Sequence, residues 1–290
     1  MIRDNHFPAS KAHHWLHQAA ECLREKGQQR PWQTARVLLS MVSQQSQEYI
    51  IAYPEKIIFD ANKANAMLQR CLQGEPISRI QGYREFYGRN FMINPHVLDP
   101  RPESELLIDQ ALRLFPHDWA GRVLEIGVGS GALLISLALE RPYCQLVGTD
   151  ISIKALGCAK ANIKAYGLQP RIQLEKASWF PQSINQKPLF DLIYANPPYI
   201  ETGLLASLDK NVRDYDPSLA LDGGVDGLDA YRAIAQGLTD FCHANTMILF
   251  EIGMGQQDAI AAIMHQAGFA LQGVEHDLAS IPRIMQFSSN

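Results

Sequence analysis

The residues with the clearest chemical potential are Asn196-Pro197-Pro198-Tyr199, directly after the apolar residues 192–194. Two consecutive prolines cannot donate hydrogen bonds to a sheet, so a buried strand must end here. The side-chain carbonyl of Asn196 and the backbone carbonyl of Pro197 are both free to accept hydrogen bonds. Together they can hold both hydrogens of a planar NH2 group, while the ring of Tyr199 offers a surface for packing.

An amide or exocyclic amine held in this way is a weak nucleophile, because its lone pair is delocalised. Two acceptors aimed at its hydrogens favour the positive charge that develops on nitrogen during attack, and they also fix its position. This chemistry makes Asn196, Pro197 and Tyr199 the predicted catalytic residues, with no strong general base required. The alternative is an ordinary turn that ends a strand, since Asn-Pro is common in turns.

A second candidate is the glycine loop Gly127-Val128-Gly129-Ser130-Gly131, which lies between a predicted strand and a predicted helix. Glycines allow positive φ and let the backbone approach a ligand closely. Asp150 ends the next predicted strand, where a carboxylate can accept hydrogen bonds from ribose hydroxyls. The loop and Asp150 therefore predict a nucleoside-binding site.

The identity of that nucleoside stays open at this point. Gly127-x-Gly129-x-x-Ala132 fits the dinucleotide fingerprint. Glu125 followed by a Gly-x-Gly-x-Gly rhythm instead resembles the nucleoside loop of S-adenosylmethionine-dependent methyltransferases. A glycine turn without any ligand is the third alternative.

The elements expected to position these residues alternate along the chain from residue 122 onward. Strands are predicted at 122–127, 144–150, 171–177, 190–195, 245–253, 269–277 and 282–287, and helices at 131–140, 153–167, 227–241 and 256–268. Such alternation predicts a Rossmann-like α/β fold, a mostly parallel seven-stranded sheet with helices on both faces. Ligands of such sheets bind beyond the carboxyl ends of the strands, where Asp150 and Asn196 are expected.

The N-terminal part of the chain has a different pattern. Residues 10–72 show helical periodicity, which predicts a small bundle of four or five helices. Residues 76–103 contain aromatic and β-branched residues interrupted by Gly and Pro, which indicates a β-hairpin linker. The expected domains are therefore 1–75, 76–103 and 104–290, the first of them docking the substrate.

Composition and charge narrow the classes of function. The 290 residues are 47% hydrophobic and 19% charged, as in an ordinary soluble protein. The net charge of -4 is unevenly spread, since residues 1–80 carry +3 and the remainder -7. An acidic C-terminal part does not favour a duplex nucleic-acid substrate.

The cysteines, histidines and apolar runs point to a cytoplasmic protein without a metal. Five widely spaced cysteines with no Cys-x-x-Cys do not favour disulfides or a thiolate zinc site. His13 and His17 share a predicted helix face but lack a third metal ligand. Apolar runs are far shorter than the ~20 residues that span a bilayer, so no membrane is expected.

These segments resemble, over essentially the whole chain, the protein-(glutamine-N5) methyltransferases that modify class 1 peptide chain release factors (the HemK/PrmC type). The motifs that carry the resemblance are PISRIQGYREFYGRNFMINPHVLDPRPESE, LEIGVGSGALLISLA, VGTDIS, ASWF, FDLIYANPPYI, DPSLALDGGVDGLDAYRAI and FEIGMGQ. NPPY is shared with several amino-methyltransferases, whereas the first and the sixth motif discriminate better. The resemblance implies a class I methyltransferase fold and methylation of the glutamine in a Gly-Gly-Gln motif by S-adenosyl-L-methionine.

The resemblance also implies roles for individual residues. The implied cofactor-binding residues are Glu125, Gly127, Val128, Gly129, Ser130, Gly131, Asp150, Trp179 and Asn196, with Trp179 along the adenine. The implied substrate-binding residues are Asn196, Pro197, Pro198 and Tyr199, with Phe86 and Tyr87 as pocket walls. For Trp179, Phe86 and Tyr87, simple burial in the core is the alternative.

Two residues depart from the family pattern, and other functions stay open. Asp99 stands where an aliphatic residue is usual, and Asp216 stands where Glu is commoner. The NPPY signature also fits an amino-methyltransferase that acts on a glutamine of a ribosomal protein, or on adenine or guanine in nucleic acid. A nicotinamide-dependent oxidoreductase or a non-catalytic nucleotide binder is the alternative from another class.

Overall fold

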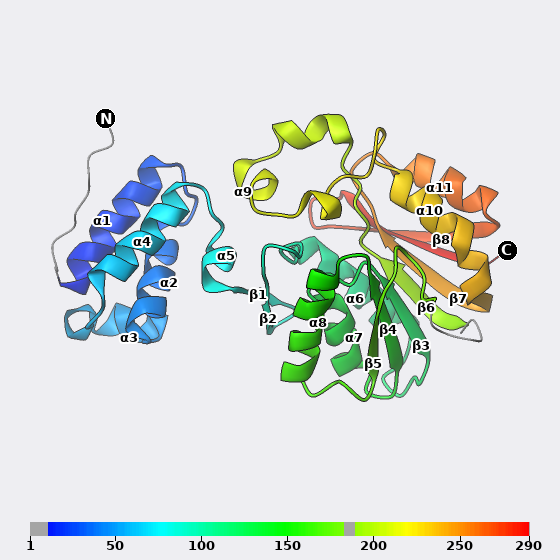
Figure 1. Ribbon diagram of the computed structural model, residues 1–290, viewed down its shortest axis with the longest axis horizontal. Helices are drawn as coiled ribbons and strands as arrows, with labels where there is room; N and C mark the ends of the chain where they lie inside the picture. The colour runs from blue at the N-terminus through cyan, green and yellow to red at the C-terminus, as the bar shows by residue number, and fades with distance from the viewer. Residues whose placement is uncertain (1–10, 183–188, 290) are drawn as a thin grey trace. The chain divides into compact units, whose positions relative to one another are not determined.

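The computed structural model describes residues 11–182 and 189–289. The chain divides into two compact units, Met1–Gly82 and Tyr83–Asn290 (Figure 1). The hairpin expected within residues 76–103 forms and belongs to the second unit. The division into three functional domains stays a prediction.

The first unit is helical, as predicted. Its helices are α1 (Ala12–Glu25), α2 (Pro31–Ser43), α3 (Gln47–Ala52), α4 (Ala61–Leu72) and α5 (Ile77–Gln81), with the 3-10 turn η1 (Pro54–Lys56). Pro31 opens α2 at a position where its missing N–H costs nothing. Asp60 caps α4 by accepting hydrogen bonds from the backbone of Asn62 and Lys63. The core of the unit centres on Trp15, whose indole N–H donates to Asn65.

The second unit contains all nine strands of the described residues. They are β1 (Tyr83–Phe86), β2 (Arg89–Met92), β3 (Arg122–Ile126), β4 (Gln145–Asp150), β5 (Ile172–Lys176), β6 (Phe190–Ala195), β7 (Cys242–Glu251), β8 (Phe269–His276) and β9 (Pro282–Ser289). The α-helices are α6 (Glu105–Leu114), α7 (Ala132–Glu140), α8 (Ile153–Ala165), α9 (Lys210–Arg213), α10 (Asp229–Leu238) and α11 (Gln257–Gln266). The 3-10 turns are η2 (Pro102–Ser104), η3 (Thr202–Ser207), η4 (Ser218–Ala220) and η5 (Thr239–Phe241).

Strands β3 to β9 form one seven-stranded sheet in the order β5-β4-β3-β6-β7-β9-β8, and β9 alone runs antiparallel to its neighbours. Residues of β6 alternate between the two faces: Leu192 and Tyr194 pack on one face, Ile193 and Ala195 on the other. Helices α6, α7 and α8 cover the first face, and α10 and α11 cover the second (Figure 1). The predicted fold class is therefore confirmed.

The segment between β6 and α10 is the main difference from the predicted elements. It contains η3, α9 and η4, none of which the sequence pattern predicted. Short 3-10 turns and a one-turn helix are too brief to show a hydrophobic period. Backbone hydrogen bonds from Ile200 to Leu221 and from Gly223 to Ile200 fold the segment back on itself. A parallel bridge between Ile200 and Asp222 marks this fold-back, which holds the segment beside the carboxyl end of β6.

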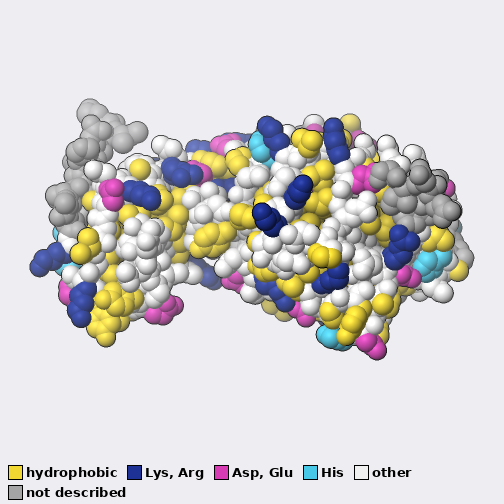
Figure 2. Space-filling model, turned by 60° about the horizontal axis from the view of Figure 1, so that its bottom comes forward, with side chains coloured by type: hydrophobic (Ala, Val, Ile, Leu, Met, Phe, Trp, Pro, Cys, Tyr) yellow, Lys and Arg dark blue, Asp and Glu magenta, His cyan; other side chains and the backbone are white. Residues whose placement is uncertain are grey.

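The surface and the helix lengths give two further observations. On the face that Figure 2 shows, Lys and Arg side chains outside the grey atoms are scattered among hydrophobic and acidic ones. A duplex-binding surface usually carries its basic side chains in one stripe instead. Throughout residues 11–182 and 189–289, every helix is too short or too polar to cross a bilayer.

Candidate functional site

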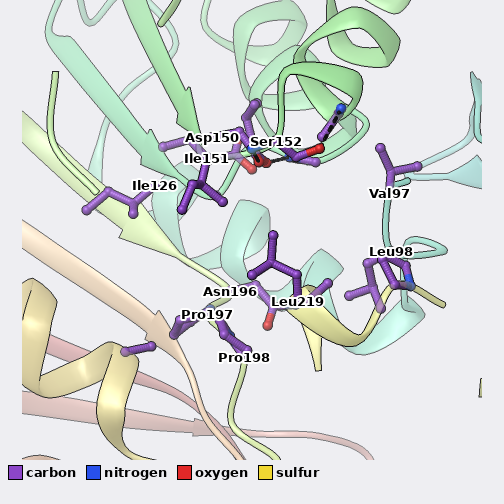
Figure 3. A pocket seen from close by; sticks show the side chains of 18 of the residues that line it. Val97, Leu98, Ile126, Asp150, Ile151, Ser152, Asn196, Pro197, Pro198 and Leu219 are labelled. Carbon is purple, nitrogen blue, oxygen red and sulfur yellow. Dashed lines mark hydrogen bonds between the residues drawn. The ribbon is translucent and has the colours of Figure 1, made fainter. Parts of the chain in front are cut away.

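A cavity of about 790 Å³ opens at the carboxyl ends of β3, β4 and β6. Its volume falls within the roughly 300–1,000 Å³ typical of ligand and cofactor pockets. Figure 3 shows Asp150, Ile151 and Ser152 on one side and Asn196 with Pro197 on the other. The structure therefore brings the two motifs singled out in the sequence together on one cavity lining.

The glycine loop is held by main-chain hydrogen bonds. The N–H groups of Gly127 and Val128 both donate to the carbonyl of Thr149, at 2.9 Å. Gly129 has a φ of +53°, a left-handed conformation that favours glycine, and a side chain at this position would point into open space. Gly131 also has positive φ and packs against Ala159 of α8, where an added Cβ would lie 3.3 Å from the alanine Cβ. The backbone of the loop thus borders the cavity directly, without side chains in between.

Asp150 ends β4 with its carboxylate tied to two backbone amides. Its Oδ2 accepts from Gly129 N–H at 2.9 Å, and its Oδ1 accepts from Ser152 N–H at 2.8 Å. Burial raises the pKa of Asp150, and these two hydrogen bonds oppose that rise. Each carboxylate oxygen has more than one acceptor site, so both can also accept from ligand hydroxyls.

Glu125, the last residue but one of β3, is a buried carboxyl group on the same lining. It lies opposite Tyr194 in the sheet register, and the tyrosine hydroxyl donates to Oε2 at 3.1 Å. Burial raises the pKa of Glu125 well above its ordinary value, although this hydrogen bond favours the charged form.

Trp179 and Ser130 complete the lining near the loop. The backbone carbonyl of Trp179 accepts from the Thr149 hydroxyl at 2.6 Å, which keeps the partly buried indole beside the end of β4. The carbonyl of Ser130 accepts from Asn162 of α8 at 2.8 Å. The same Asn162 amide exchanges hydrogen bonds with the backbone N–H and C=O of Met92, each at 2.9 Å. One buried side chain therefore ties the hairpin to the glycine loop.

Asn196, Pro197 and Pro198 line the cavity directly after β6. Because side chains alternate across the sheet, Asn196 lies on the same face as Tyr194, which is the face covered by α6. Its Nδ2 donates to the hydroxyl of Ser104 at 3.0 Å. An added Cβ at Gly223 would lie 2.8 Å from the Pro198 carbonyl, so this close approach requires glycine.

The three aromatic residues predicted to bind the substrate do not all line the main cavity. Phe86 lines the main cavity and is almost fully buried. Tyr87 is outside that lining, because its backbone N–H donates to Glu105 and its hydroxyl donates to Asp109 of α6. Tyr199 lines a smaller neighbouring cavity of about 300 Å³ that shares Asn196 with the first.

The two residues that depart from the family pattern meet in space. The carboxylate of Asp216 accepts from the backbone N–H of Asp99 at 3.2 Å and pairs with the guanidinium of Arg101. Arg84 of the hairpin lies 3.6 Å from the Asp99 carboxylate. These contacts anchor the cavity-lining residues Val97, Leu98, Pro100 and Arg101 to the segment after β6.

Sequence reasoning did not single out Ser104 and Glu251 as site residues. Ser104 ends η2, and its hydroxyl donates to Glu251 Oε2 at 2.5 Å. Glu251 is buried at the end of β7, and burial raises its pKa to about 7. One signal was present, since the sequence Glu-Ile-Gly occurs at the carboxyl end of both β3 and β7. Repetition of an acidic residue at two strand ends of one predicted sheet points to the same edge of the fold.

The chain is similar to several characterised families and structures. Residues 14–82 match the family described as PrmC N-terminal domain, and residues 102–210 match the methyltransferase small domain family. A release factor glutamine methyltransferase of Agrobacterium fabrum is 35% identical over 93% of this chain and 94% of that protein. A bifunctional methyltransferase of Rickettsia bellii is 34% identical over 94% of this chain, which spans only 54% of that protein. A methyltransferase structure from Pyrococcus furiosus, 16% identical, has a TM-score of 0.52 over 77% of this chain and 98% of that one, which supports the fold alone.

Proposed function

The chain belongs to the release factor glutamine methyltransferase family, and we propose that it methylates the glutamine side-chain amide, at N5, in the Gly-Gly-Gln motif of class 1 peptide chain release factors. The methyl donor is S-adenosyl-L-methionine. The observation that carries the proposal is that the Asp150 carboxylate and the Asn196 carboxamide line one cavity. A nucleoside donor held by the first and an amide held by the second would share the space between them.

The lining suits a nucleoside that carries a positive charge. Open backbone at Gly129 leaves room for close approach, and the Asp150 carboxylate keeps acceptor sites for two ribose hydroxyls. Ile151 and the partly buried Trp179 offer apolar surface to a flat base. We assign cofactor binding to Glu125, Gly127, Val128, Gly129, Ser130, Gly131, Asp150, Trp179 and Asn196.

On the substrate side, the Asn196 side-chain carbonyl and the Pro197 backbone carbonyl accept the two hydrogens of the glutamine amide. Pro198 and Tyr199 continue the rigid corner, and Phe86 is assigned as a wall, whereas Tyr87 bonds to α6 outside the lining. Asn196, Pro197 and Tyr199 are the proposed catalytic residues. Their contribution is positioning and stabilisation of the charge that develops on nitrogen.

The bound S-adenosyl-L-methionine supplies a methyl group activated by its attachment to a sulfonium. Asp150 and the glycine loop would hold this donor, and Asn196 and Pro197 would hold the amide nitrogen that accepts the methyl group. The two acceptors hold the N–H groups throughout, and one proton leaves to solvent afterwards. The chain therefore needs no strong base beside the nitrogen.

We further propose that the N-terminal unit docks the release factor, and that the protein acts in the cytoplasm. Several large apolar side chains of this unit are exposed: Trp32, Tyr49, Ile51, Tyr53 and Ile58. Exposed aromatic and aliphatic groups of this kind favour a protein partner. The acidic charge of the remainder favours a protein over a nucleic-acid substrate.

The test is transfer of a radiolabelled methyl group from S-adenosyl-L-methionine to a purified class 1 release factor. The control is a release factor whose Gly-Gly-Gln glutamine is replaced by alanine, and mass spectrometry locates the methyl group. We expect label on the wild-type factor alone, unaffected by excess NAD. Equal labelling of the control factor, or labelling of ribosomal RNA or ribosomal protein in its place, would refute the proposal.

A further inference from the structure

A chain of buried hydrogen bonds runs from Asn196 to Ser104, which lines the same cavity, and on to Glu251, which lines the smaller one. Asn196 Nδ2 donates to Ser104 Oγ at 3.0 Å, and the Ser104 hydroxyl donates to Glu251 Oε2 at 2.5 Å. Ser104 and Glu251 are each 3% exposed. Both side chains are therefore almost fully shielded from bulk water.

The direction of this chain is set by chemistry. An ionised carboxylate can only accept, so the Ser104 hydroxyl must donate to Glu251 and use its oxygen to accept from Asn196. Only the NH2 end of the Asn196 amide can then face Ser104, which leaves its carbonyl for the cavity. Without such a constraint the terminal torsion of asparagine has two broad, nearly equivalent orientations.

We propose that Ser104 and Glu251 are positioning residues, which hold the Asn196 carboxamide with its carbonyl turned toward the substrate amide. This inference rests on the proposed function, because only an amide or amine substrate requires an acceptor at that place. Neither residue touches the reacting atoms; both act through Asn196.

The position of Ser104 follows from the fold. Glu251 lies on the sheet face that α6 covers, and Ser104 directly precedes α6. Tyr231 of α10, on the opposite face, donates its hydroxyl to the backbone carbonyl of Glu251 at 2.7 Å. Contacts on both faces of the sheet thus fix the end of β7, and the Glu251 carboxylate accepts the hydrogen bond from Ser104.

The surroundings of Glu251 make the constraint sensitive to pH. Burial raises its pKa to about 7; the Ser104 and Asn196 hydrogen bonds and Arg283 of β9 lower it, while Glu103 raises it. The other charged or titratable side chains facing it are Arg101, Tyr199 and Tyr231. A protonated Glu251 can donate to Ser104, and the direction of the chain is then lost. Correct orientation of Asn196 is therefore expected above neutral pH and is lost as the pH falls below it.

The first test needs no substrate. The side-chain amide signals of Asn196 are assigned in the ¹H–¹⁵N spectrum of the full chain by their loss in Asn196→Ala, and are then followed against pH. We expect these signals to titrate with a midpoint near neutral pH in the wild type and not in Glu251→Gln. Signals that do not titrate, or that titrate equally in Glu251→Gln, would overturn the inference.

The second test uses methyl transfer to the release factor. Ser104→Ala should lower kcat about tenfold, as loss of one buried hydrogen bond predicts, with cofactor affinity and KM unchanged. Ser104→Thr, which keeps the hydroxyl, should recover most of the rate, and Glu251→Gln should lose the acid limb of the kcat profile. Ser136→Ala, at a fully buried serine of α7 outside the cavity lining, is the matched control.

The two proposals fail separately. A wild-type chain that does not methylate release factors refutes the proposed function, while the amide titration still decides the role of Glu251. A wild-type chain that methylates them, combined with a Ser104→Ala variant at the full rate, refutes the inference alone.

Discussion

The two sides of the cavity are built in different ways. On the side of the glycine loop, the hydrogen bonds join backbone amides to residues about twenty positions away, as from Gly129 to Asp150. On the side of Asn196, the hydrogen bonds join side chains that are far apart in the sequence. Asn196 and Ser104 are 92 residues apart, and Ser104 and Glu251 are 147 residues apart. The first side is local and mostly main chain; the second is distant and depends on single side-chain atoms.

This difference predicts different consequences of substitution. Main-chain geometry persists when side chains change, provided that the glycines with positive φ are kept. A side chain that acts through one carbonyl has no substitute once that carbonyl is removed. Substitutions on the Asn196 side should therefore affect catalysis more than binding, and those on the loop side should affect binding and stability.

The largest effect is expected for Asn196→Ala. We expect kcat to fall about 100- to 1,000-fold, the usual cost of removing one group that stabilises developing charge. Cofactor affinity, measured by calorimetry, should change far less than kcat, since Asp150 and the loop remain. The control is Asn245→Ala, at an exposed asparagine of β7. A rate near wild type would contradict the role assigned to Asn196.

Glu251→Gln tests the Asn196 side of the cavity through the free energy of unfolding. The raised pKa of about 7 means that the native protein holds a proton which the unfolded chain, with a pKa near 4.5, releases. The stability from this group is complete below pH 4.5 and is lost as the pH rises through 7. The variant should therefore be more stable than wild type at pH 8 by roughly 3 kcal/mol, and the difference should shrink toward pH 5. Parallel stability curves against pH, from denaturant unfolding, would contradict the burial of a carboxylate here.

Asp150→Ala tests the loop side. The ribose hydroxyls lose their acceptor, and the amides of Gly129 and Ser152 lose theirs. We expect cofactor affinity to fall roughly 10- to 100-fold, as for hydrogen bonds to a charged group, while kcat at saturating cofactor changes much less. Asp118→Ala, at an exposed aspartate, is the control. Unchanged affinity in Asp150→Ala would show that the loop binds without this carboxylate.

The last variant, Asn162→Ala, tests stability alone. This amide joins Met92 of the hairpin to Ser130 of the loop and is 1% exposed. Its loss leaves buried backbone groups without a partner, which should lower the free energy of unfolding by about 1–3 kcal/mol. Urea denaturation measures this loss. A variant as stable as wild type would show that the hairpin is held mainly by its apolar contacts.

The periodicity of the chain predicted the sheet well but missed the segment after β6. Strands buried on both faces have long apolar runs, as in β6 and β7, and these runs are visible without any tertiary information. The turns η3, α9 and η4 are too short for a period, and hydrogen bonds such as Ile200 to Leu221 hold them in place. Tyr87 shows the same limit, since Glu105 and Asp109 of α6 decide where an aromatic residue of the hairpin points.

The sequence by itself determined the α/β fold, the glycine loop with Asp150 and the rigid corner at Asn196, because each depends on interactions within a few residues or within one strand–helix–strand unit. The hydrogen-bond partners of the Asn196 side chain depend on how α6 packs on the sheet. Ser104 and Glu251 belong to two separate motifs, and the hydrogen bond of 2.5 Å between them exists only because α6 packs on the face where β7 ends. Side-chain contacts across a sheet depend on the packing of layers, which no local pattern records.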